Sequence, residues 1–299
     1  MHRQAAQTGE IAGTDRSIRT DLAMEAAEAA VLTAEDIEKK DVTRGGVHIT
    51  DITVKSERGE RELGHNRGRY VTAEVPPLSD DDRSLEEYAV IIGEYIASLL
   101  PKTGTVLVAG LGNIHVTPDA LGPQAADMVL ATRHIGGEFA RSTGLDDLRP
   151  VAVLTPGVLG QTGIESGEVV RGVCQAVSPA AVIAIDALAA RSLTRLGCTV
   201  QLADTGIAPG SGIGNNRRRL DRELLGMPVI AVGVPTVVDA RTLVAELTGQ
   251  EADEEGASMI VTPREIDLVI DRASRLVAMA INSALQPSYS PLELISIAV

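Results

Sequence analysis

From residue 105 onward, the chain alternates short apolar runs with longer segments of helical periodicity, and this alternation constrains the fold most. Apolar runs this short and continuous suit strands that are buried on both faces of a parallel sheet. The intervening segments, at about 120–134, 165–177, 187–195, 237–247 and 263–285, suit helices. The pattern predicts an α/β fold with a doubly wound, mostly parallel sheet and helices on both faces. The predicted strands are Thr105–Ala109, Val151–Leu154, Val182–Ile185, Thr199–Leu202 and Val229–Val232.

The first 80 residues follow a different pattern. Residues 47–54 and 69–75 alternate polar and apolar side chains, which predicts two paired strands. The segment between them is charged and contains glycine, so it is expected to be an exposed loop. We therefore expect a single α/β domain over residues 22–299, in which residues 22–80 form an N-terminal addition to the sheet.

Charge and composition exclude several classes of function. The 299 residues include 27 basic and 41 acidic side chains, a net charge of -14. Nucleic acids and anionic membranes bind basic surfaces, so neither is expected as a direct partner. No apolar run approaches the roughly 20 residues that span a bilayer, and the N-terminus lacks the apolar stretch of a secretory signal. Cys174 and Cys198 have no metal-ligand spacing, so we expect reduced thiols, a cytoplasmic protein and no metal or cofactor.

A glycine turn, Gly-Leu-Gly-Asn at residues 110–113, follows the first predicted strand and raises the question of a phosphate site. A dinucleotide fingerprint has a third glycine three residues later and opens directly into a helix. Here that position is His115, and Pro118 delays the helix. A non-catalytic nucleotide-binding module is therefore kept only as an alternative. The turn is expected instead to bring Asp119 to the edge of the sheet.

Two aspartates follow predicted strands at the same edge of the sheet. Asp119 lies beyond the first strand, and Asp186 ends the apolar run Val182–Ile185. Two carboxylates a few ångströms apart do not both ionise easily, so one keeps its proton while the other acts as a base. Such a pair activates water and protonates a leaving amine, which hydrolyses a peptide without a covalent intermediate. Two alternatives stay open: either aspartate could cap a following helix, or both could join His115 in a metal site.

Five long motifs occur in order between residues 110 and 240. They read GLGNIHVTPDALGP, TPGVLGQTGIES, IAIDALAARS, DTGIAPGSGIGNNR and GMPVIAVGVPTVVDA. Together with SIRTDLAMEA and GRYVTAEV nearer the N-terminus, they resemble the germination protease family of spore-forming bacteria over about residues 15–285. The resemblance implies an atypical aspartic-type endopeptidase whose catalytic aspartates match Asp119 and Asp186. It also implies a fold similar to that of hydrogenase-maturation peptidases, which keeps a metal-dependent peptidase as the alternative.

The resemblance further implies the substrates and the maturation of the enzyme. The family degrades small acid-soluble spore proteins in the spore core during germination, and a homotetramer is expected. It is made as a zymogen, and it cuts after an acidic residue that precedes an apolar residue and alanine. The sequence Thr20-Asp21-Leu22-Ala23 fits this preference. We therefore expect residues 1–21 to be a propeptide that is removed by self-cleavage between Asp21 and Leu22.

An acidic residue beside the cut bond requires a binding site on the enzyme. A glycine-rich segment at 210–216 offers backbone N–H groups and leads into the arginines at 217–219, a combination that binds carboxylates. A solvated loop followed by a basic helix start would look the same. Arg191, five residues after Asp186, is a second candidate. The residues expected to bind substrate are Asn113, Arg191, Gly212, Gly214, Asn215 and Arg217.

Overall fold

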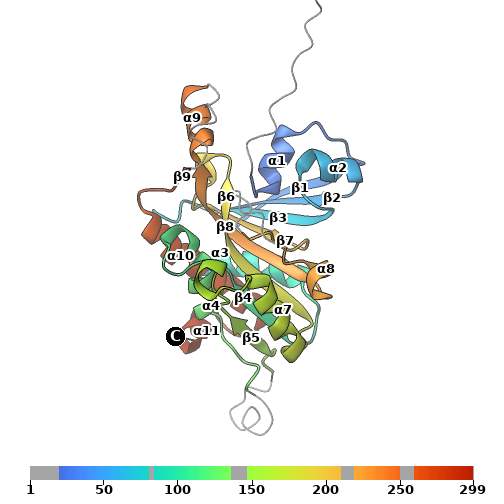
Figure 1. The fold of residues 1–299 in the computed structure, drawn as a ribbon, viewed down its shortest axis with the longest axis vertical. Coiled ribbons are helices and arrows are strands. Elements are labelled where there is room, and N and C mark those ends of the chain that lie inside the picture. The colour runs from blue at the N-terminus through green and yellow to red at the C-terminus, as the bar shows by residue number, and fades with distance from the viewer. Residues whose placement is uncertain (1–19, 81–83, 136–146, 210–218, 250–258, 299) are drawn as a thin grey trace, which may run out of the picture.

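The structure is a computed structural model, and it describes residues 20–80, 84–135, 147–209, 219–249 and 259–298. Its centre is a mixed sheet whose described strands run in the order β1-β2-β3-β7-β8-β6-β4-β5, with β9 paired to β8 (Figure 1). The strands are β1 (Ile37–Arg44), β2 (Val47–Val54), β3 (Gly68–Glu74), β4 (Val106–Gly110), β5 (Val151–Leu154), β6 (Ala181–Ala190), β7 (Thr199–Ala203), β8 (Val229–Asp239) and β9 (Ile260–Val261).

The sheet has a parallel half and an antiparallel half. Strand β4 pairs in parallel with β5 and β6, and β6 pairs in parallel with β8. The predicted N-terminal pair is confirmed as β2 and β3, which run antiparallel, and the α/β class is confirmed. Strand β7, which was expected to be parallel, runs antiparallel to both β8 and β3. Residues 191–198, which join β6 to β7, are too few for the crossover of a dozen or more residues that a parallel strand needs.

Helices cover both faces of the sheet, which explains why its central strands are apolar throughout. In β6, Ile183 and Ile185 face a core formed with α3, α4, α10 and α11, whereas Val182 and Ala184 face a second core formed with α1, α2, α7 and α8. Among the described helices, none is both long and apolar enough to cross a membrane. The helices are α1 (Ala23–Ala29), α2 (Glu57–Leu63), α3 (Leu85–Leu99), α4 (Leu121–Asp127), α6 (Leu159–Thr162), α7 (Ser166–Val177), α8 (Arg222–Leu225), α9 (Ala240–Thr248), α10 (Ile266–Leu285) and α11 (Pro291–Ala298).

The segment after Asp186 corrects the sequence prediction. The sequence predicts a helix at 187–195, but β6 continues through Ala190, and a 3-10 turn, η2 (Leu193–Arg195), follows it. The run Ala187–Ala190 is short and apolar enough for either structure. It is a strand because its residues pair with β8 as far as Ala190 opposite Val238. Asp186 therefore lies inside a strand and does not cap a helix.

Two elements near the N-terminus carry little sequence signal. Strand β1 is an edge strand of mostly exposed and charged residues, so it lacks the alternation that marks β2. Helix α2 lies in the segment that was predicted to be a loop. Its start is fixed by Ser56, whose hydroxyl accepts a hydrogen bond from Gly59 N–H (3.0 Å), and its end by Gly64, at a φ of 68°. In Figure 1, α1 and α2 lie beside β1 to β3 at the upper right.

Candidate active site

The glycine turn after β4 closes onto Asp119. Leu111 N–H donates to the Ile185 carbonyl of β6 (2.8 Å), which fixes the start of the turn against the neighbouring strand. Gly112 has a φ of 112°, and a Cβ atom there would lie only 2.1 Å from the Asp119 carbonyl oxygen. Asn113 N–H donates to Oδ2 of Asp119 (2.7 Å). The turn thus holds a carboxylate of this chain with an N–H group that a phosphate site would leave open.

Asp119 is half-buried in a 3-10 turn, η1 (Thr117–Asp119), which packs against β6 and β8. The hydroxyl of Thr236 on β8 donates to the Pro118 carbonyl (2.8 Å) and ties η1 to the sheet. The Asn113 side chain accepts hydrogen bonds from Gln161 Nε2 (2.7 Å) and His115 N–H (3.0 Å). Asn113, which was expected to bind substrate, therefore lies in the network that shapes the loop around Asp119.

Asp186 lies near the middle of β6 and is almost completely buried, with 4% of its surface exposed. Its Oδ1 accepts a hydrogen bond from Ala187 N–H (3.0 Å). Its neighbour Ile185 pairs with Gly110 at the end of β4, where the turn toward Asp119 begins. The structure thus places Asp119 and Asp186 at the same end of the parallel strands, where ligands of open α/β sheets bind.

A cleft of about 780 Å³ opens on the face of the sheet that α1 and α2 cover. Its floor includes Gly233, the register partner of Asp186 on β8. Its lining also carries three arginines, Arg61, Arg191 and Arg219, which suit a peptide with acidic side chains. The cleft is large enough for several residues of an extended peptide.

One wall of the cleft is formed by Tyr70 and His65. Their rings meet edge to face, with centroids 5.4 Å apart and an interplanar angle of 82°. The Tyr70 hydroxyl donates to the Asn66 carbonyl (2.7 Å) and accepts from the Thr205 hydroxyl (3.0 Å). Burial raises the pKa of the Tyr70 phenol to about 12, so the ring is neutral at physiological pH.

The predicted substrate-binding residues have different outcomes. Arg191 is exposed and lines the cleft, and its backbone N–H donates to Oε2 of Glu25 (2.7 Å). Glu25 also accepts from Ser192 N–H (2.9 Å) and is 5% exposed. Sequence reasoning missed Glu25, because its backbone partners Arg191 and Ser192 are more than 160 positions away along the chain. The other candidates, Gly212, Gly214, Asn215 and Arg217, lie outside the described residues.

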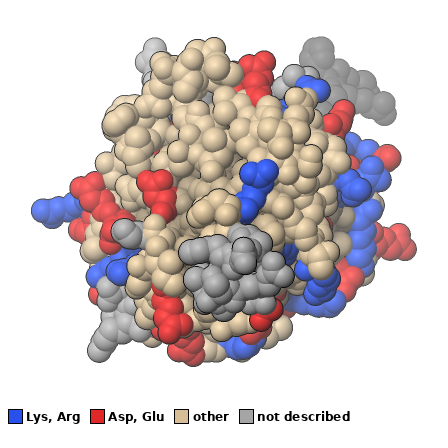
Figure 2. All heavy atoms as spheres, turned by 90° about the horizontal axis from the view of Figure 1, so that it is seen from below, with Lys and Arg blue, Asp and Glu red and all other residues tan. Residues whose placement is uncertain are grey.

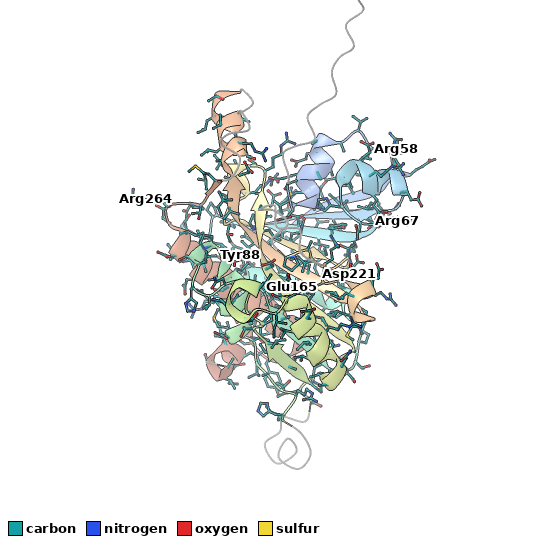
Figure 3. The ribbon with its side chains drawn as sticks, in the orientation of Figure 1. Arg58, Arg67, Tyr88, Glu165, Asp221 and Arg264 are labelled. Carbon is teal, nitrogen blue, oxygen red and sulfur yellow. The ribbon has the colours of Figure 1, made fainter. Side chains whose placement is uncertain are left out.

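Charged side chains outside the cleft carry both signs. Arg58 and Arg67 project from the outer side of the region around α2, where Arg67 pairs with Glu60 (3.3 Å) (Figure 3). On the face drawn in Figure 2, acidic and basic side chains are interspersed around a broad uncharged area. That face therefore differs from the concentrated basic surface by which proteins bind nucleic acids.

The predicted cleavage segment is docked into the cleft. Asp21 N–H donates to the Ala189 carbonyl (3.0 Å), and Ala189 N–H donates to Oδ2 of Asp21 (2.9 Å). Leu22 and Ala23 are completely buried, so the start of α1 belongs to the second core. The segment is thus held against Ala189, near the end of β6 and three residues after Asp186.

The metal alternative finds no support in the described part of the chain. Within it, no three His, Cys, Asp or Glu side chains are grouped so that they could hold a metal ion. His115 is exposed, and its backbone N–H is engaged by Asn113. The positions of His115, Asp119 and Asp186 therefore disfavour a shared metal site.

Comparisons with known proteins add an independent finding. Residues 16–249 match the family model described as germination protease. The germination protease of Caldanaerobacter subterraneus subsp. tengcongensis is 41% identical, with 93% of this chain and 97% of the relative covered. That of Priestia megaterium is 41% identical, with 80% of this chain and 70% of the relative covered. Among solved structures, the NiFe hydrogenase maturation protease of Thermococcus kodakarensis KOD1 is 18% identical, with a TM-score of 0.38, and the match covers 64% of this chain and 98% of that one.

Proposed function

Because the chain belongs to the germination protease family, we propose that it is an endopeptidase that degrades small acid-soluble spore proteins during germination. In this proposal it acts in the cytoplasm of the spore core, as a homotetramer. It cuts after an acidic residue that precedes an apolar residue and alanine. The observation that supports this proposal most is that Asp119 and Asp186 both follow the end of β4, while Gly233, the register partner of Asp186, lines a cleft that also carries three arginines.

The proposed chemistry uses the two aspartates as an acid–base pair. The ionised carboxylate takes a proton from a water molecule, and the water oxygen then attacks the carbonyl carbon of the scissile bond. The protonated carboxyl gives its proton to the leaving nitrogen, and the carbon–nitrogen bond breaks. The sheet and the glycine turn fix the two side chains before substrate binds, which reduces the entropic cost of aligning them.

We also propose that residues 1–21 are a propeptide. The docking of Asp21 against Ala189 supports this role, because Asp21, which precedes the proposed cleavage bond, lines the cleft, while Leu22 after it is buried. N-terminal sequencing of the matured protein tests the assignment. A mature chain that starts at Leu22 is expected, and a different terminus would refute it.

The catalytic proposal is tested by digesting a purified small acid-soluble spore protein with the wild type, Asp119→Asn and Asp186→Asn, each with and without EDTA. Loss of either general acid or base is expected to lower the cleavage rate by roughly 10²–10⁴-fold. The matched control is Asp127→Asn, an exposed aspartate at the end of α4, which should keep the wild-type rate. Full activity in either test variant would exclude that aspartate from the chemistry. Loss of wild-type activity on EDTA, with recovery on adding a divalent ion, would favour the metal-dependent alternative.

A further inference from the structure

The carbonyl group of Asp21 is held by two side chains that the proposed acid–base pair does not include. The side-chain amide of Gln201 on β7 donates from Nε2 to the Asp21 carbonyl oxygen (2.5 Å). The ring nitrogen Nε2 of His65, in the loop after α2, lies 3.3 Å from the same oxygen. This carbonyl belongs to the peptide bond that the proposed self-cleavage breaks. The inference that follows therefore rests on the proposed function.

Gln201 contacts the peptide on both sides of that bond. Its Oε1 accepts a hydrogen bond from Ala23 N–H (2.7 Å), while its Nε2 donates to the Asp21 carbonyl. One amide thus spans the bond between Asp21 and Leu22 and fixes the orientation of its plane. Gln201 is 7% exposed, and a buried amide that is satisfied at both ends has a well-defined position.

The sheet places Gln201 across from Asp186. Asp186 of β6 lies opposite Gly233 of β8, and Gly233 lies opposite Gln201 of β7. Directly opposite residues in neighbouring strands point to the same face, so Asp186 and Gln201 lie on one face of the sheet at the two ends of one row, and Gln201 and Gly233 line the cleft. Two interstrand spacings put their Cα atoms about 10 Å apart. Gly233, between them, carries no side chain, and Leu188 lies against it, so the floor is low and apolar.

His65, in the loop after α2, is the second side chain that contacts the Asp21 carbonyl oxygen. Its Nδ1 lies 2.9 Å from the Leu63 carbonyl oxygen, and its Nε2 faces the Asp21 carbonyl oxygen. Both ring nitrogens therefore face carbonyl oxygens, which can only accept hydrogen bonds. The edge-to-face contact with Tyr70 fixes the plane of the ring.

We propose that Gln201 and His65 are the oxyanion-binding residues of the self-cleavage reaction. When water adds to the Asp21 carbonyl carbon, the carbonyl π electrons move onto its oxygen, and the negative charge develops where the two donors already point. The electron pair on this oxygen re-forms the carbonyl when the carbon–nitrogen bond breaks, and the Leu22 nitrogen takes a proton from the protonated carboxyl of the acid–base pair. Donors that are in place beforehand stabilise this charge more than that of the neutral carbonyl, which accelerates the reaction.

The test compares self-cleavage of the full chain in the wild type, Gln201→Glu, Gln201→Met, His65→Gln and Asp186→Asn. Gln201→Glu keeps the shape and the acceptor for Ala23 N–H, but replaces the donor with a negative charge. It is expected to slow self-cleavage by about 10²–10³-fold, as loss of one oxyanion donor does. The slowing should equal or exceed that in Gln201→Met. The matched control for His65→Gln is His48→Gln on β2, a histidine outside the cleft whose side chain is 45% exposed, which should cleave at the wild-type rate.

The outcomes separate the two proposals. If Gln201 only packs the segment in place, Gln201→Glu should cleave faster than Gln201→Met, and that order would overturn the oxyanion role. Wild-type rates in Gln201→Glu and His65→Gln, with Asp186→Asn inactive, would also overturn it while leaving the proposed function intact. If the wild type does not produce a chain that starts at Leu22, the cleavage proposal fails and the oxyanion role fails with it. Urea midpoints within error of the wild type would show that the variants are folded.

Discussion

Adding one methyl group at Gly122 should disrupt the packing of α4 against the turn after β4 and against β6, next to Asp119 and Asp186. Gly122 is the second residue of α4, three residues after Asp119. A Cβ atom at this position would lie 2.1 Å from the Leu111 carbonyl oxygen and 2.6 Å from the Ile185 carbonyl oxygen. Both contacts are with backbone, so a side chain cannot rotate away to relieve them. In Gly122→Ala, α4 must therefore move away from β4 and β6 by more than an ångström.

The size of the effect follows from two opposing terms. Forcing an extra methyl group into a well-packed site costs about 3 kcal/mol or more when backbone must move. Replacing a helical glycine with alanine returns about 1 kcal/mol. The net loss in the free energy of unfolding should thus be at least about 2 kcal/mol, which for 299 residues corresponds to a Tm lower by roughly 3 °C or more. The cleavage rate should also fall, because η1 and Asp119 move with the start of α4.

The control is Gly172→Ala. Gly172 lies on the exposed side of α7, and a Cβ atom there would meet nothing within 4 Å. This variant should be about as stable as the wild type, or up to roughly 1 kcal/mol more stable, because only the helix-propensity term applies. Urea unfolding of the two variants, together with a digestion assay, measures both quantities. The reasoning would be refuted if Gly122→Ala kept full activity and its free energy of unfolding differed from that of Gly172→Ala by less than about 0.5 kcal/mol, the usual effect of a neutral surface substitution.

Three further predictions concern ionisable side chains. The Tyr70 phenol should titrate near pH 12 in a spectrophotometric titration, and this step should disappear in Tyr70→Phe. Because burial raises its pKa, the contribution of Tyr70 to the free energy of unfolding is full below about pH 10 and is lost between about pH 10 and 12. Asp51→Asn should lower the free energy of unfolding by about 1–2 kcal/mol, since Asp51 accepts charge-assisted hydrogen bonds from Arg69, at 2.8 Å from Nη2 and 3.1 Å from Nε; an unchanged urea midpoint would contradict this. Burial raises the pKa of the Cys174 and Cys198 thiols, so both should react with a disulfide reagent at pH 8 at least about tenfold more slowly in the native than in the unfolded chain.

The strands of the parallel half could be predicted from sequence because each is buried on both faces. The full length of β6 could not be, since Ala187–Ala190 has no periodicity that separates a strand from a helix, and only its pairing with β8 decides between them. The charged edge strand β1 gave no apolar pattern to detect. The antiparallel direction of β7 depended on the short connection before it, whose structure was mispredicted as a helix.

The residues of the candidate site also fall into two groups, those that the sequence could locate and those that it could not. Asp119 and Asp186 could be located because each follows or interrupts an apolar run, and strand ends of a parallel sheet meet at one edge. Gln201, His65 and Glu25 carry no such signal. Gln201 is one polar residue in a strand, and its partner Asp21 lies 180 positions away along the chain. Their roles depend on register between β6, β8 and β7, which no local pattern determines.

The contact between His65 and Tyr70 has a practical consequence for optical measurements. The chain contains no tryptophan, four tyrosines and one phenylalanine, so its intrinsic near-ultraviolet emission comes almost entirely from tyrosine. One of these four emitters lines the cleft that holds Asp21, with its ring against the histidine that contacts the Asp21 carbonyl. When the docked segment leaves the cleft, the environment of Tyr70 changes, and with it the emission of one of the four tyrosines. Unlabelled protein therefore carries its own reporter for cleft occupancy, readable in real time.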